Sequence, residues 1–125
     1  MCVVLSLAVA GIALAHQDGI KLSEKDGVGK FLADPGGMTL YVFKKDSPGK
    51  SVCAGPCLVK WPLFYREMVT APEGVHASDF GTITREDGKK QTTYKGWPLY
   101  YFEGDKAPGD AKGHGLGNVW FAANP

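Results

Sequence analysis

A ten-residue block that occurs twice constrains this chain more than any other feature. The first copy is Gly37-Met-Thr-Leu-Tyr-Val-Phe-Lys-Lys-Asp46, and the second, Gly96-Trp-Pro-Leu-Tyr-Tyr-Phe-Glu-Gly-Asp105, begins fifty-nine positions later. Gly, Leu, Tyr, Phe and Asp are shared, and a Trp follows each block after fifteen further residues. A fixed repeat of this kind indicates a duplicated supersecondary unit whose two copies bury a common face.

The length and composition favour one small β domain. A chain of 125 residues is long enough for a single hydrophobic core. Its formal net charge of +1 provides no field suited to nucleic acid or to an anionic membrane, so we expect no nucleic-acid partner. The 17 glycines and 8 prolines lie among many aromatic and β-branched residues, a mixture typical of strands and turns. We expect an all-β fold with at most a minor helix, a small antiparallel sandwich or barrel built from the repeats 28–62 and 80–120.

Each repeated block is apolar on both faces of an extended strand. Leu40 and Val42 point to one face and Tyr41 and Phe43 to the other, which is typical of a central strand covered on both sides. We therefore expect the repeated positions to form one interior, with Tyr41 superposing on Tyr100 and the two Trp residues on each other. The structural positions of the repeat are Leu40, Tyr41, Phe43, Asp46, Trp61, Leu99, Tyr100, Phe102, Asp105 and Trp120.

Turn residues predict a hairpin in each half. An Asp-Pro-Gly-Gly turn separates strands expected at 29–33 and 39–43, and an Asp-Gly turn separates strands expected at 81–85 and 90–94. Gly29 and Gly36 match Gly81 and Gly88 at an offset of 52, which indicates that the hairpin is duplicated too, with seven residues added in the second copy. A helical turn is expected before Pro62, and a last strand at 119–122.

The first fifteen residues are a small, apolar run that ends in Ala13-Leu14-Ala15. This ending fits a signal-peptidase site, and the run is too short to span a bilayer. We expect a signal peptide over 1–15, a flexible lead-in over 16–27 and one exported domain over 28–125 without a transmembrane segment. A lipid anchor at Cys2 is the alternative.

Two cysteines remain after removal of the signal. Cys53 and Cys57 are an even pair in an exported chain, which predicts a disulfide that pins the loop 51–57. A redox dithiol is the alternative, but the pair is spaced one residue wider than the C-x-x-C of thioredoxin-like proteins.

The chain resembles a family of exported bacterial domains. Its motifs Tyr41-Val-Phe-Lys-Lys-Asp46 and Tyr100-Tyr-Phe-Glu-Gly-Asp105 are similar to the Tyr-x-aromatic-x-x-Asp motif of secreted repeats, also described as predicted lipoproteins. Further matches are Ser51-Val-Cys-Ala-Gly-Pro-Cys57, Trp61-Pro62, Arg85-Glu-Asp-Gly88, Gln91, Pro108-Gly-Asp110 and Trp120. The resemblance covers about 28–125 and implies export but no established activity and no catalytic residues. Two positions depart from it, where the family pattern has Asp at His114 and His at Phe121.

Several polar residues allow a structural and a functional interpretation. Asp46 and Asp105 follow buried strands, where an Asp side chain accepts hydrogen bonds from the next turn. The alternative is a cation held by Asp105, Asp110 and His114 with loop carbonyls. An N-terminal His16, with His76 or His114, is a second metal hypothesis, for copper.

No enzymatic motif is present. The sequence has no serine in a nucleophile elbow, no flanking carboxylate pair and no phosphate loop. We therefore expect a non-enzymatic domain of the periplasm, cell surface or extracellular space, without a cofactor, which acts as a binding or envelope-associated module for an unknown envelope or extracellular partner. The alternative is a redox- or metal-linked accessory protein that uses Cys53 and Cys57 or the Asp and His loop residues.

Overall fold

The computed structural model describes residues 19–125. The expected signal segment, Cys2 and His16 lie outside this part of the chain. Within it the fold is all-β with one small helix, as the composition predicted. The strands are β1 Lys21–Lys25, β2 Gly29–Ala33, β3 Tyr41–Phe43, β4 Phe80–Thr84, β5 Lys90–Tyr94, β6 Trp97–Pro98 and β7 Trp120–Ala122.

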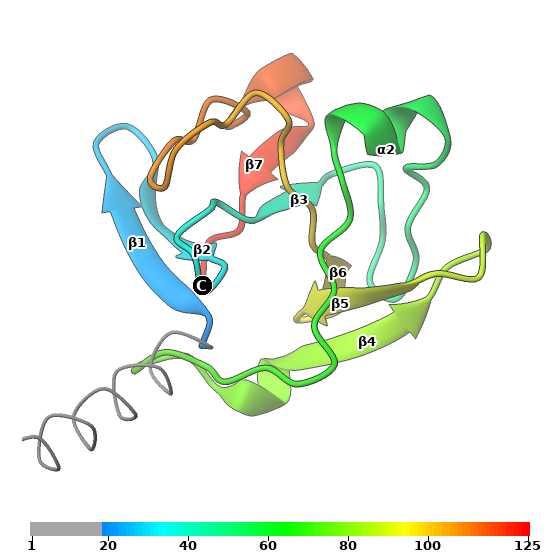
Figure 1. The fold of residues 1–125 in the computed structure, drawn as a ribbon, viewed down its shortest axis with the longest axis horizontal. Helices are drawn as coiled ribbons and strands as arrows, with labels where there is room; N and C mark the ends of the chain where they lie inside the picture. Colours follow the sequence, from blue (N-terminus) through cyan, green and yellow to red (C-terminus); the bar gives the residue numbers. More distant parts are fainter. Residues whose placement is uncertain (1–18) are drawn as a thin grey trace, which may run out of the picture.

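The strands form three small antiparallel sheets, β1–β2, β3–β7 and β4–β5–β6. In Figure 1 the β1–β2 hairpin and the β4–β5 hairpin lie on opposite sides of the molecule, with β3 and β7 between them. Helix α2, Pro56–Lys60, ends just before Trp61-Pro62, and two 3-10 helices lie at Ala77–Asp79 and Leu116–Asn118. Among residues 19–125, no helix has the length and apolar character needed to cross a membrane.

The first hairpin differs from its prediction. Residues 16–27 were expected to be a loose lead-in, but Lys21–Lys25 form β1 and pair with β2 along their whole length. The alignment at an offset of 52 is therefore wrong, because Gly29 begins the second strand of its hairpin whereas Gly81 lies in the first strand of the other. The sequence of β1 gives no strand signal because its side chains are mostly polar and exposed, and only Ser23 is half-buried.

The two copies meet at the two motif tyrosines. The backbone N–H of Tyr41 donates to the carbonyl of Tyr100 at 2.8 Å, and the N–H of Tyr100 donates to the carbonyl of Tyr41 at 2.9 Å. Because each residue makes the same bond to the other, an approximate twofold axis passes between them. The motif strands are thus central and antiparallel to each other.

A ring of three backbone hydrogen bonds, which joins three residues in a cycle, also surrounds the motif leucine of each copy. In each ring one residue of the motif strand, one of the hairpin and one of a third segment donate in turn to the next. The rings are Leu40 to Leu32 to Ala123 to Leu40, and Leu99 to Thr92 to Phe64 to Leu99, with N to O distances of 2.8–3.0 Å. The third segment comes from the other copy, so neither ring closes within one repeat.

The interior is divided by the motif strands into two clusters. One contains the leucines, Leu40 and Leu99, and the other contains the tyrosines, Tyr41 and Tyr100, and all four side chains are fully buried. This confirms that both faces of the motif strands are covered. Burial of a leucine or aromatic side chain stabilises the fold by about 1.5–3 kcal/mol.

The first glycine of each block contacts a proline of the other copy. Gly37 and Gly96 have φ of +93° and +86°, and a Cβ at either would lie 2.9 Å from Cβ of Pro108 or Pro48. The carbonyls of the same glycines accept the N–H groups of Gly109 and Gly49. The two Pro-Gly turns are therefore seated directly on the repeated glycines.

We expect Gly37→Ala and Gly96→Ala each to lower the free energy of unfolding more than Gly88→Ala. All three glycines have positive φ, which costs an L-residue about 1–2 kcal/mol. A Cβ at Gly88 meets nothing within 4 Å, whereas at the other two it overlaps proline, which adds roughly 1–3 kcal/mol. Urea unfolding measures the difference, and equal losses at the three sites would contradict the packing described.

Candidate functional site

The motif tyrosines and aspartates are hydrogen-bonded across the two copies. The hydroxyl of Tyr41 donates to Oδ2 of Asp105 at 2.6 Å, and the hydroxyl of Tyr100 donates to Oδ2 of Asp46 at 2.7 Å. The Asp residues are only 5–7% exposed. Each copy therefore supplies the donor that the buried carboxylate of the other copy needs.

The second oxygen of each carboxylate binds the loop that follows its own strand. Oδ1 of Asp46 accepts the N–H of Val52 at 2.8 Å, and Oδ1 of Asp105 accepts the N–H of Lys112 at 2.9 Å. The sequence predicted hydrogen bonds to the following backbone, and the exchange between copies was missed. Its signal in the sequence is the Tyr and the Asp at the same spacing in both copies.

Four aromatic rings form a continuous stack beside these hydrogen bonds. Trp61 and Trp120 are parallel at 3.8 Å, Phe43 stacks on Trp120 at 4.1 Å, and Phe102 stacks on Trp61 at 4.3 Å. Each Phe lies on the Trp of the other copy. The order within the stack is thus symmetric about the contact between the two Trp rings.

Burial keeps the tyrosine hydroxyls protonated. It raises the pKa of Tyr41 and Tyr100 well above the ordinary value, and the hydrogen bonds to aspartate act in the same direction. Tyr101, whose hydroxyl donates to Oδ2 of Asp34 at 2.7 Å, has a raised pKa for the same reasons. Burial also raises the pKa of Asp46, although the hydrogen bonds from Val52 and Tyr100 oppose this. These groups are donors and acceptors of structural hydrogen bonds.

A buried arginine connects the second hairpin to the cysteine loop. Arg85 is 7% exposed, and its guanidinium donates to the carbonyl of Cys53 at 2.6 Å and to Oε1 of Gln91 at 2.8 Å. Nε faces the carboxylate of Asp87 at 3.1 Å. The predicted disulfide between Cys53 and Cys57 is present, with Cys53 buried. In the sequence Arg85 stands out only as part of the resembled motif, and its hydrogen bonds to the cysteine loop were not predicted.

The residues of the metal hypothesis are each engaged with backbone. Asp105 is bonded as described above, and Oδ2 of Asp110 accepts the N–H groups of Lys106 and Ala107, which lower its pKa. Nδ1 of His114 accepts the N–H of Ala122 at 3.0 Å. No three His, Cys, Asp or Glu side chains within residues 19–125 come close enough to hold a metal ion.

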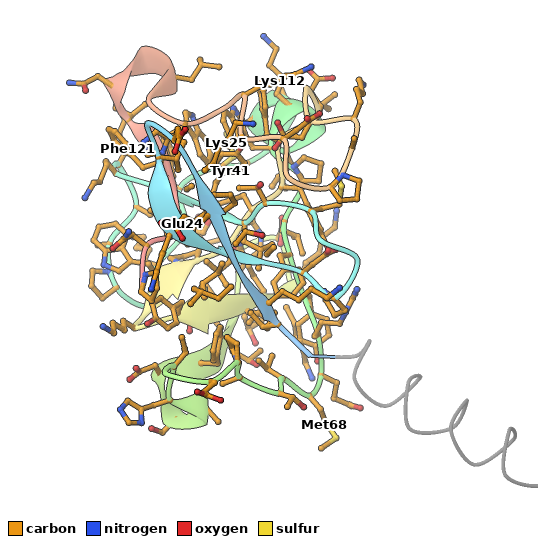
Figure 2. The ribbon with its side chains drawn as sticks, turned by 90° about the vertical axis from the view of Figure 1, so that its left-hand side faces the viewer. Glu24, Lys25, Tyr41, Met68, Lys112 and Phe121 are labelled. Atoms are coloured by element: carbon orange, nitrogen blue, oxygen red, sulfur yellow. A yellow bond between two sulfur atoms is a disulfide. The ribbon has the colours of Figure 1, made fainter. Side chains whose placement is uncertain are left out.

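A cavity of about 470 Å³ lies between β3, β7 and the β5–β6 turn. We call it the Trp97 cavity. Its wall includes Val42, Lys44, Tyr94, Trp97, His114 and Phe121. Figure 2 labels Phe121, which lies on β7, whereas Tyr41 lies farther inside the fold. His114 and Phe121, the two positions expected from the sequence to differ from the resembled family, both line this cavity. The sequence did not predict the cavity, because its walls come from five separate segments, one of them the β1–β2 turn at Val28.

The other copy has large side chains at the equivalent place. Tyr101 is the repeat counterpart of Val42, and Phe64 is the counterpart of Ala123, which also lines the cavity. The rings of Phe64 and Tyr101 pack edge to face at 5.7 Å. The Trp97 cavity therefore lies where one copy has small residues and its twin has two aromatic rings.

The buried hydroxyls are expected to limit stability at alkaline pH. Tyr41, Tyr100 and Tyr101 should add no tyrosinate absorbance near pH 10 while the protein is folded, because burial raises their pKa values well above the ordinary value for tyrosine. In the unfolded chain they ionise there, so the unfolded state binds fewer protons and the free energy of unfolding falls as the pH rises above about 10. Ultraviolet titration checks this. Tyr41→Phe should leave the native amplitude near pH 10 unchanged, and a smaller amplitude would contradict the assignment.

The disulfide is expected to act as a structural crosslink. Replacing both Cys53 and Cys57 by Ala should lower the free energy of unfolding by about 2 kcal/mol, since the closed loop is short. Denaturant unfolding measures the loss, and the unsubstituted protein in strong reductant should lose a similar amount. Unchanged stability of the variant would show that the crosslink does not support the fold.

Comparison with known proteins identifies the family. Residues 23–64 and 81–124 each match the family described as a secreted repeat of unknown function. Each matched segment contains one Tyr–Asp motif and the Trp that follows it. No curated protein and no solved structure matches the chain. Because the two matches cover more than half of the sequence and coincide with the two structural copies, the chain belongs to the family of secreted repeats of unknown function.

Proposed function

We propose that the protein is a non-enzymatic binding module that holds a small molecule in the Trp97 cavity. The observation that carries the proposal is the difference between the two copies at this place. Where Tyr101 and Phe64 fill one side of the molecule, Val42 and Ala123 leave a cavity of about 470 Å³ on the other. This volume lies within the range of small-molecule sites, which are concave and mostly apolar.

The composition of the cavity wall supports a binding role. Trp97 and Phe121 are half-buried, so part of each ring remains exposed. Exposure of aromatic surface to water is unfavourable in free energy, and a bound apolar molecule would remove that exposure. In the other copy the same cost is avoided, since Tyr101 packs on Phe64 and its hydroxyl donates to Asp34.

The motif residues support a structural role rather than a catalytic one. Both oxygens of Asp46 and of Asp105 accept hydrogen bonds from the protein itself. A general acid or base has to reach a substrate, and these carboxylates are buried away from the Trp97 cavity wall. The disulfide likewise has one buried cysteine, which favours a crosslink over a redox centre.

Two observations support a binding step outside the cytoplasm. The family is described as secreted, and the disulfide is the kind of bond that persists in oxidising compartments. We place the module in the periplasm, at the cell surface or in the extracellular space, where it would take up its ligand from the envelope or the medium.

Filling the cavity should weaken binding of an apolar probe. We expect Val42→Phe to weaken binding of the neutral dye N-phenyl-1-naphthylamine at least tenfold, because the added ring occupies the space that Tyr101 fills in the other copy. Phe is chosen over Tyr because the Tyr101 hydroxyl needs Asp34 as its acceptor. Thr92 takes the place of Leu32 in the second ring of hydrogen bonds, so Tyr94 takes the place of Asp34 and provides no carboxylate. Fluorescence titration of the dye measures binding.

Val59→Phe is the matched control. Val59 is 71% exposed on α2 and does not line the cavity, so this substitution should leave dye binding unchanged. Thermal unfolding of both variants establishes that they fold. Equal binding by Val42→Phe and the unsubstituted protein, or no binding by either, would overturn the proposed function.

A further inference from the structure

We infer that the ligand of the Trp97 cavity is a small molecule with a flat apolar body and one negatively charged group, of which a carboxylate is the simplest. This inference rests on the proposed function and adds the chemistry of the ligand to it. Three features of the wall that residues 19–125 form carry it: a lysine placed over two rings, the absence of acidic side chains, and a histidine N–H that no protein group accepts.

The lysine lies over two aromatic rings of the wall. Nζ of Lys44 is 5.7 Å from the ring centre of Trp97 and 5.9 Å from that of Phe121. Attraction between the ammonium group and the two rings favours a position of the charge beside the cavity, although Lys44 remains exposed. A flat molecule lying against the same rings would therefore have the Lys44 ammonium group next to its edge.

The net charge of the wall is positive. Lys95 is the second cation, with Nζ 5.4 Å from the ring centre of Tyr94, and no Asp or Glu is among the described residues that line the cavity. The repeat counterpart of Lys44 is Glu103, so the charge at this place differs in sign between the two copies. A cationic ligand would be repelled here, and a neutral one would leave both ammonium groups without a counter-charge.

His114 adds a hydrogen-bond donor. Its Nδ1 accepts the N–H of Ala122, so in the neutral ring the proton is on Nε2. Among residues 19–125 no protein group accepts Nε2–H, which is therefore open to solvent or to a ligand, and His114 lines the cavity. A carboxylate is a suitable acceptor for such an N–H and for a lysine ammonium, and His114 and Lys44 both lie against the ring of Phe121.

Three probes that share one ring system test the inference. We expect naphthalene-2-carboxylate to bind about three- to fivefold more tightly than naphthalene-2-carboxamide at low salt, the gain typical of a partly exposed ion pair, and 2-naphthylmethylammonium to bind most weakly. The preference for the anion should shrink as salt is added, because exposed charges are screened. Two-dimensional NMR locates binding, since the indole N–H signal of Trp97 should shift while those of Trp61 and Trp120, buried in the stack, stay in place.

Lys44→Glu and Lys45→Glu form a matched pair of variants. Both change the same charge by the same amount on neighbouring exposed residues, but only Lys44 lines the cavity. Lys44→Glu should abolish the preference for the anionic over the cationic probe, because the new carboxylate offsets the remaining charge of Lys95, whereas Lys45→Glu should keep the preference of the unsubstituted protein.

The outcomes separate this inference from the proposed function. If the neutral probe binds at Trp97 as tightly as the anion, the charge assignment is overturned and the binding function stands. If no probe shifts the Trp97 signal, both fail. An anion preference that survives in Lys44→Glu, or is lost equally in Lys45→Glu, would overturn the role assigned to Lys44.

Discussion

The exchange of hydrogen bonds between the two Tyr–Asp motifs is the interaction on which the rest of the fold depends. A carboxylate buried without a partner is strongly destabilising, so Asp46 requires Tyr100 and Asp105 requires Tyr41. Since the hydroxyl donor comes from the other copy, neither repeat supplies partners for both oxygens of its own carboxylate. The two halves must therefore fold as one unit.

The same interdependence extends to both faces of the motif strands. On the leucine face, each ring of backbone hydrogen bonds needs a segment of the other copy. On the tyrosine face, Phe43 stacks on Trp120 and Phe102 stacks on Trp61. For a chain this short the buried area is limited, and the disulfide and the Arg85 hydrogen bonds strengthen a region that contains only a short helix.

The departures from twofold symmetry are as informative as the symmetry itself. The repeated tyrosines, aspartates and tryptophans keep equivalent contacts, which shows what the shared fold requires. Val42 and Tyr101 are free to differ because they lie next to the motif tyrosines without taking part in the exchange. At that place one copy is closed by packed rings and the other has the Trp97 cavity, so a symmetric scaffold has an asymmetric surface.

Local patterns in the sequence were enough for much of the architecture. The composition and the repeated block predicted an all-β fold, and the apolar residues at both odd and even positions of the block predicted two motif strands covered on both faces. The Asp-Gly turn predicted the β4–β5 hairpin, and the even cysteine count predicted the disulfide. These features depend on the spacing of neighbouring residues, which the linear order contains. The strand β1 escaped prediction because its side chains are mostly exposed and have no apolar period.

Only the tertiary structure decided which residues meet. Periodicity tells which face a side chain occupies but not its partner, and Tyr41 and Asp105 are 64 positions apart. The Trp97 cavity depends on residues from β3, the β5–β6 turn, the loop at His114 and β7, so its shape follows from how two copies dock. The sequence by itself determined that two similar halves share one interior, whereas the docking of those halves decided where that interior is filled and where it is left open.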